Sequence, residues 1–247
     1  MGYSRVIAGA QRAWRISSKG FGFQRIITHL LLGGMTVMLY LLIGFLAPEG
    51  KQVGVLIIAL GYLSLLLIGA TMIIGPLNLL RSRRNPVNID LRRDVGIWAA
   101  IAGCWHVLLV FRGTVLNGQI LYYFLQTGCC GYSLQLNIYG FSNDTGLFAT
   151  LLLLLLLALS NAASLRFLKG KWWKRIQRLT YLLALLAVAH TVGYQYLNQR
   201  GQFLFVAVII LSILTLACQG FGIVLTVSRQ RRNNRNSTLL RSSSRTR

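Results

Sequence analysis

The sequence predicts an all-α integral membrane protein, a bundle of six transmembrane helices with both termini in the cytoplasm. The 247 residues are 55% hydrophobic and only 12% charged, with a mean hydropathy of +0.59, which is too apolar for a soluble domain of this size. Six stretches are long and apolar enough to cross a hydrocarbon core of about 30 Å. They cover roughly residues 26–46, 52–79, 95–112, 145–165, 176–197 and 202–228.

The third observation is the distribution of positive charge along the chain. Of the 26 Lys and Arg residues, five precede the first span, five separate spans two and three, six lie between spans four and five or just inside span five at Arg178, and seven follow the last span. The other three are Lys51, Arg112 and Arg200, in or beside the alternate connections. This positive-inside pattern places both termini in the cytoplasm and explains the net charge of +22 without nucleic acid as a partner.

The chain divides into a central membrane domain and two basic ends. Residues 1–25 form a basic segment with an amphipathic pattern, which we expect to lie at the membrane surface. Residues 26–228 form the six-helix domain, whose first span serves as a signal anchor rather than a cleaved signal peptide. Residues 229–247 are basic and rich in Ser and Asn, and we expect a disordered tail that contacts the anionic lipids of the bilayer.

Two of the three histidines lie deep inside predicted spans. His106 follows Asp94 by twelve residues, and His190 follows Arg178 by twelve residues. At a helical rise of about 1.5 Å per residue, both rings stand about 18 Å above the same membrane face. His29 lies at the edge of the first span, as an interfacial histidine would. The equal depth of the other two predicts a pair of ligands with a shared partner.

Small residues share a helical face with each histidine, and Gly103 and Gly193 are the nearest of these on the two helices. They permit either close helix packing or room for a flat cofactor. All four acidic residues lie at span edges or in loops, which disfavours a zinc or copper site and a proton path through buried carboxylates. Together with the level imidazoles, this favours a haem ligated by His106 and His190. Arg112 and Arg200 either neutralise its propionates or anchor the spans at the interface.

The connection on the outer side is rich in aromatic residues between Leu116 and Phe141. Its tyrosines either form an interfacial aromatic belt or cap the site and receive a partner. Cys129 and Cys130 are adjacent in this connection, and adjacent cysteines rarely bridge each other. We interpret them as ordinary thiols.

Two segments resemble the ferric reductase-like transmembrane domain family: RRDVGIWAAIAGCWHVLLVF (92–111) and the stretch from TGLFATLLLLLLLALSNAASLRFLKG to RLTYLLALLAVAH (145–190). The resemblance implies a six-helix bundle that carries electrons through haem b, with His106 and His190 as axial ligands. Relatives usually have a histidine where this chain has Gln177. The amide of glutamine is not a usual ligand of haem iron, so we expect a single haem near the outer face.

The resemblance implies a redox subunit rather than a complete enzyme. Electrons would come from a membrane quinol or from a separate flavin reductase, with FMN implied by the resemblance alone, and would leave toward an outer-side acceptor. The alternative is a structural or assembly subunit of a larger membrane complex that keeps the fold with little or no redox function. In either case we expect a multi-pass protein of the bacterial inner membrane or an equivalent energy-transducing membrane.

Overall fold

Six long helices dominate the architecture. The computed structural model describes residues 23–46, 52–80, 89–116, 120–128, 131–198 and 202–245. Within these residues, the helices long and apolar enough to cross a membrane are α2 (Phe23–Leu46), α3 (Gln52–Leu80), α4 (Ile89–Leu116), α5 (Ile138–Ala158), α8 (Leu179–Asn198) and α9 (Gln202–Arg245). The prediction of a multi-pass all-α membrane protein is therefore confirmed.

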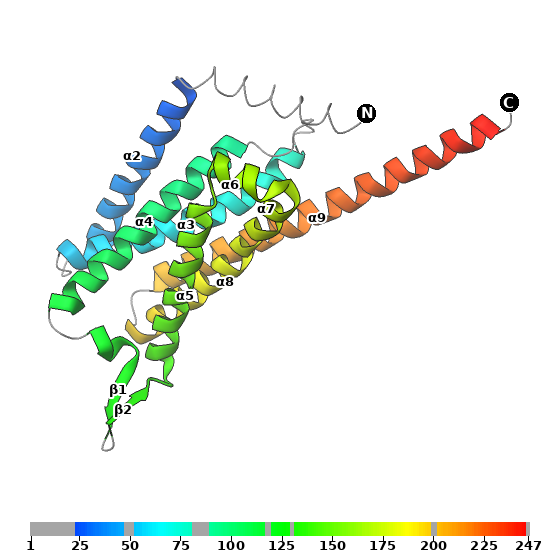
Figure 1. Ribbon diagram of the computed structural model, residues 1–247. Helices are drawn as coiled ribbons and strands as arrows, with labels where there is room; N and C mark the ends of the chain where they lie inside the picture. Colours follow the sequence, from blue (N-terminus) through cyan, green and yellow to red (C-terminus); the bar gives the residue numbers. More distant parts are fainter. Residues whose placement is uncertain are drawn as a thin grey trace.

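Short elements lie at the two opposite ends of the bundle (Figure 1). We use "outer" for the end that the charge distribution places away from the cytoplasm, where α4 ends and α5 begins. That end carries the 3₁₀ helix η1 (Ile120–Tyr123) and an antiparallel hairpin of β1 (Leu125–Gly128) and β2 (Gly131–Leu134). The inner end carries α6 (Ala162–Phe167) and α7 (Lys169–Gln177).

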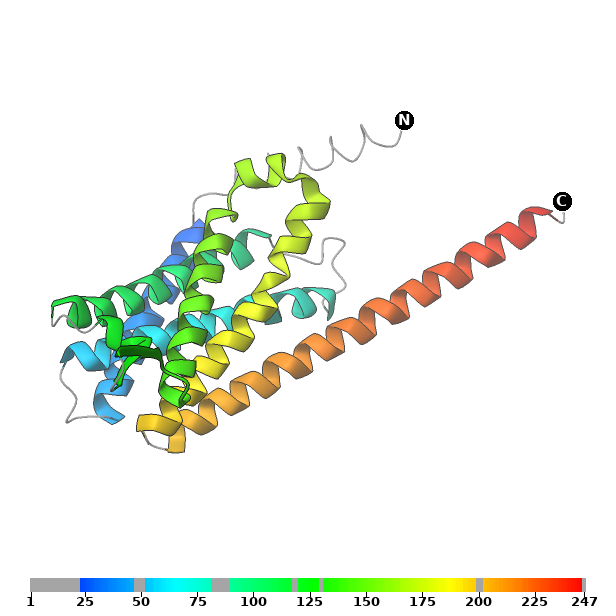
Figure 2. The same cartoon turned by 60° about the horizontal axis from the view of Figure 1, so that its bottom comes forward.

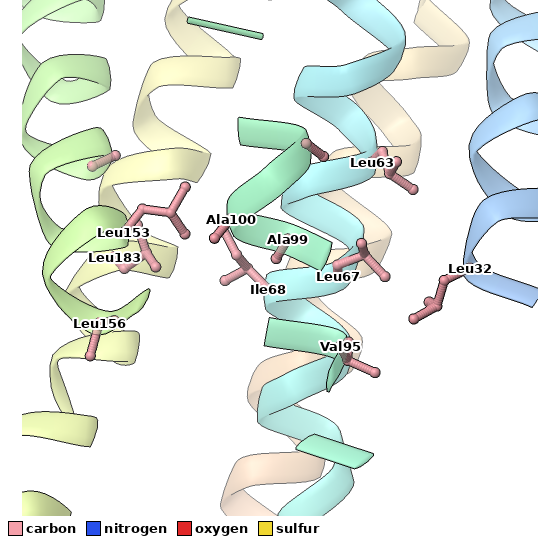
Figure 3. Close-up of a cluster of buried hydrophobic side chains, with 12 residues drawn as sticks. Leu32, Leu63, Leu67, Ile68, Val95, Ala99, Ala100, Leu153, Leu156 and Leu183 are labelled. Atoms are coloured by element: carbon pink, nitrogen blue, oxygen red, sulfur yellow. The ribbon is translucent and has the colours of Figure 1, made fainter. Parts of the chain in front are cut away.

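The core lies where α4 packs between α3 on one side and α5 and α8 on the other. Figure 3 shows Ala99 and Ala100 of α4 at the centre of this cluster, and both are buried. Small side chains let helix backbones approach closely inside a membrane protein. The approach allows Ser64 of α3 to donate a 2.9 Å hydrogen bond to the carbonyl of Ala99. This packing fixes the helices that carry the histidines.

Helix α5 begins earlier than the sequence predicted. The predicted span covered 145–165, whereas α5 covers Ile138–Ala158. Asn137 caps its start by accepting a 2.8 Å hydrogen bond from the amide of Gly140. The hydroxyl of Ser142 donates to the carbonyl of Ile138 one turn earlier, so this side chain is satisfied within the helix. The predicted boundary left residues 138–144 in the outer connection, and that boundary was wrong.

A hydrogen bond connects helix α9 to α3 one turn before a proline. Pro76 has no amide hydrogen, so the carbonyl of Met72 loses its partner in the α3 ladder. The side-chain amide of Gln219 on α9 donates a hydrogen bond to that carbonyl. Tyr181 of α8 donates a 3.2 Å hydrogen bond to the amide oxygen of Gln219. A buried carbonyl freed by proline is thus satisfied by a neighbouring helix.

Three further boundaries differ from the predicted ones. Helix α4 begins at Ile89, so Asp94 lies inside the helix and is buried. A break at Arg178 separates α7 from α8, which puts Gln177 at the end of the inner helix α7.

Helix α9 continues to Arg245 past the other helices (Figure 2), where we predicted a disordered tail. Residues after 228 extend a helix that already exists, so they form helix without the cost of nucleation. The amphipathic segment predicted at the N-terminus lies mostly outside the described residues.

Candidate functional site

The structure brings His106 of α4 and His190 of α8 together in the outer half of the bundle. Their ring centres are 6.2 Å apart and their planes are nearly perpendicular, at 88°. Each histidine precedes the outer end of its span, Gly113 or Leu197, by seven residues. The two rings therefore lie at the same level of the bundle.

Each imidazole is held by a backbone carbonyl of a neighbouring helix. The Nδ1 of His106 lies 2.8 Å from the carbonyl oxygen of Ile57 in α3. The Nδ1 of His190 lies 2.7 Å from the carbonyl oxygen of Ser142 in α5. A carbonyl oxygen only accepts, so Nδ1 of each ring carries the hydrogen. In a neutral imidazole this leaves the lone pair on Nε2, which is the form that ligates a metal.

Glycines make these two hydrogen bonds sterically possible. Gly61 follows Ile57 by four residues, and Gly146 follows Ser142 by four residues. A Cβ at position 61 would lie 3.0 Å from Nδ1 of His106, and a Cβ at position 146 would lie 2.5 Å from Nδ1 of His190. The two histidines are therefore held by the same device: a helical glycine, with the carbonyl one turn before it as acceptor.

Sequence reasoning identified the histidines but missed both of these glycines. The sequence does contain a signal for them, because each glycine interrupts an apolar helix at the level of the histidines. This signal could not be interpreted without knowing that α3 faces α4 and that α5 faces α8.

The glycines chosen from the sequence lie in tight helix contacts. A Cβ at Gly103 would lie 2.6 Å from Leu153 and 3.0 Å from the hydroxyl of Ser64. A Cβ at Gly193 would overlap the side chain of Ser142. Both positions need glycine for helix packing beside the histidines, and their contact with a cofactor stays a prediction.

The two predicted arginines are placed differently. Arg112 is exposed near the outer end of α4, six residues after His106. Arg200 lies outside the described residues. A role for either in neutralising a propionate stays a prediction.

The chain has three histidines, so His29 alone remains for the inner half, which cannot form a second histidine pair. The Nδ1 of His29 accepts a 2.8 Å hydrogen bond from Nε1 of Trp98, which joins α2 to α4. Among the described residues, no group of three or more His, Cys, Asp or Glu side chains could hold a metal ion. The His106–His190 pair is the candidate ligand set in this part of the chain.

A known family of membrane proteins matches the central part of the chain. The family described as ferric reductase like transmembrane component matches residues 53–188, which is more than half of the chain. The match includes His106 and the whole of α5, and it ends two residues before His190. No curated protein matches the chain.

Proposed function

Because the chain belongs to the ferric reductase-like transmembrane component family, we propose that it is a haem b electron-transfer protein of the membrane. Members of this family typically bind haem and transfer electrons across a membrane. One haem would be held between His106 and His190. It would relay electrons toward an acceptor on the outer side.

The separation of the two rings carries this proposal. Two imidazoles that held one metal ion between them through Nε2 would have ring centres about 6.4 Å apart, from a metal–nitrogen bond of about 2 Å and about 1.2 Å from that nitrogen to the ring centre. The observed separation is 6.2 Å. Because each Nδ1 is bonded to a carbonyl, Nε2 is the nitrogen that remains for iron. The residues present therefore fit a haem with two histidine ligands.

The roles of the protein follow from these contacts. The carbonyls of Ile57 and Ser142 fix the orientation of the rings and increase the basicity of Nε2. A bound haem supplies one-electron chemistry. With a histidine on each side no coordination position stays open for a substrate, so the site would transfer electrons and not transform a bound molecule.

A single haem leaves the inner half of the bundle without a redox group of its own. Gln177 ends α7, and its carbonyl accepts a 2.8 Å hydrogen bond from the Thr180 hydroxyl. Electrons would enter from a membrane quinol or from a separate flavin reductase that carries FMN. Residues 92–111 and 145–190 resemble the haem-binding membrane subunit of the bacterial methionine sulfoxide reductase system. Arg112 and Arg200 would neutralise the haem propionates at the outer end.

The test is haem binding by the purified protein and three histidine variants. We expect a reduced haem b spectrum from the unaltered protein and from His29→Ala, because His29 bonds Trp98 away from the pair. His106→Ala and His190→Ala should each lose the haem. Full haem retention in both variants would overturn the proposal. A colourless protein that copurifies with a stable partner would instead favour a structural subunit of a larger complex.

A further inference from the structure

Three tyrosines form a line of aromatic rings from His190 to the outer end of the bundle. The ring of Tyr194, one turn after His190 on α8, lies 5.0 Å from the histidine ring, centre to centre. Tyr139 of α5 lies 6.2 Å from Tyr194, and Tyr123 of η1 lies 5.9 Å from Tyr139. All three separations lie in the range of aromatic rings in contact. The line crosses from α8 to α5 and then to η1.

A buried asparagine fixes both ends of this line. The side chain of Asn143 on α5 is 6% exposed. Its amide oxygen accepts a hydrogen bond from the hydroxyl of Tyr194, and its nitrogen donates a 2.8 Å hydrogen bond to the carbonyl of Tyr123. One side chain therefore holds α8 and η1 against α5. The rings keep their order because their backbones are tied together.

The line ends in a segment without charged residues. Tyr123 is half-buried, and its neighbour Tyr122 is 48% exposed. Residues 116–143 contain no Asp, Glu, Lys or Arg. The segment itself therefore carries no charge that would repel an electron acceptor of either sign.

From this arrangement we infer that Tyr194, Tyr139 and Tyr123 form the route by which an electron leaves the histidine pair for a soluble one-electron oxidant bound beside η1. The inference rests on the proposed function. Electron tunnelling weakens steeply with the gaps between atoms along its path, and contacting rings leave small gaps. In this step the site between the histidines loses one electron and the oxidant gains it. No bond forms or breaks, and no proton moves.

The experiment compares two substitutions at the middle ring. Haem-loaded protein is reduced, freed of reductant and mixed with ferricyanide, and the haem absorbance is followed in a stopped-flow instrument. Tyr139→Leu removes the ring, and we expect reoxidation to slow several-fold. Tyr139→Phe keeps the ring and loses only the hydroxyl, and we expect the rate of the unaltered protein. Tyr196→Leu is the matched control, because Tyr196 is 72% exposed on α8.

Two further measurements separate the route from a structural effect. Haem content and midpoint potential should be the same in Tyr139→Leu as in the unaltered protein. In the apoprotein, the near-ultraviolet circular dichroism of the tyrosines should change in Tyr139→Leu and stay the same in Tyr196→Leu, since it reports fixed aromatic packing. If Tyr139→Leu does not fold, Tyr123→Leu removes the ring farthest from His190 and carries the same expectation.

Each outcome has one meaning. Reoxidation of a folded, haem-loaded Tyr139→Leu protein at the unaltered rate would overturn the tyrosine route. An equal slowing in Tyr139→Phe would also overturn it, because the hydroxyl and not the ring would then be needed. A colourless unaltered protein would contradict the proposed function instead.

Discussion

Replacing Gly146 with alanine tests whether the glycine and the carbonyl one turn before it hold the two histidines in place for haem. The new Cβ would lie 2.5 Å from Nδ1 and 2.7 Å from Cε1 of His190. The same change at Gly61 would place Cβ 3.0 Å from Nδ1 and 3.1 Å from Cε1 of His106. The two sites use the same device with different clearances. They should therefore respond differently to the same added methyl group.

The size of each response follows from the contact distances. An ordinary Cβ contact begins at 3.4 Å. If each ring moves directly away from the new Cβ until its Nδ1 is 3.4 Å from it, His190 must move by about 0.9 Å and His106 by about 0.4 Å. The 2.7 Å hydrogen bond of His190 then lengthens to about 3.6 Å and is lost, whereas the 2.8 Å bond of His106 lengthens to about 3.2 Å and survives.

Loss of a hydrogen bond behind a ligating histidine typically weakens metal binding by about 10–100-fold. We expect Gly146→Ala to weaken haem binding by that amount and Gly61→Ala to change it by less than about threefold. The assay is titration of the apoprotein with haem, followed by absorbance. Gly75→Ala on α3 is the control, because no atom lies within 4 Å of a Cβ at that position. Equal affinities for the Gly146 and Gly61 variants would refute the reasoning.

Two further predictions concern the fold. Gln219→Leu leaves the carbonyl of Met72 without a donor, so we expect a loss of about 1–3 kcal/mol of unfolding free energy in detergent. Pro76→Ala restores a backbone donor to that carbonyl, so Gln219→Leu should cost less in that background; an equal cost would contradict the account. Burial, with the neighbouring Tyr139, raises the pKa of Tyr123, so the folded protein holds this proton more tightly than the unfolded chain. The unfolding free energy should therefore fall as pH rises above about 10, and less steeply in Tyr123→Phe; identical slopes would contradict this.

The features that could be predicted from the sequence depend on composition and on spacing within one helix. Apolar length alone places six spans, because every spanning segment must cover the same hydrocarbon thickness. The distance from a charged residue gives the depth of His106 and His190, because a helix rises by a constant amount per residue. Neither inference requires knowledge of which helices are neighbours. Both are therefore accessible from the chain alone.

The features that were missed depend on contacts between helices. Gly61 and Gly146 matter because a ring from another helix approaches them, and the sequence of α3 or α5 does not record that approach. The start of α5 was misplaced because the sequence does not record the partners that the side chains of Ser142 and Asn143 find in the folded chain. Asn143 has the character of a loop residue, and only the structure shows that it ties α8 to η1. These features depend on which helices are neighbours, and the periodicity of a single helix does not contain that information.

The support of each ligand by a neighbouring helix links cofactor binding to the stability of the bundle. His106 reaches from α4 to α3, and His190 reaches from α8 to α5, so separation of either helix pair breaks the hydrogen bond at Nδ1. A group that binds only the folded arrangement stabilises it by mass action. Haem bound between the rings would join the two helix pairs through one metal ion, and the packing of each pair would in turn hold Nε2 of its histidine in place. Substitutions that loosen α5 from α8 should therefore lower haem affinity even where they touch neither histidine.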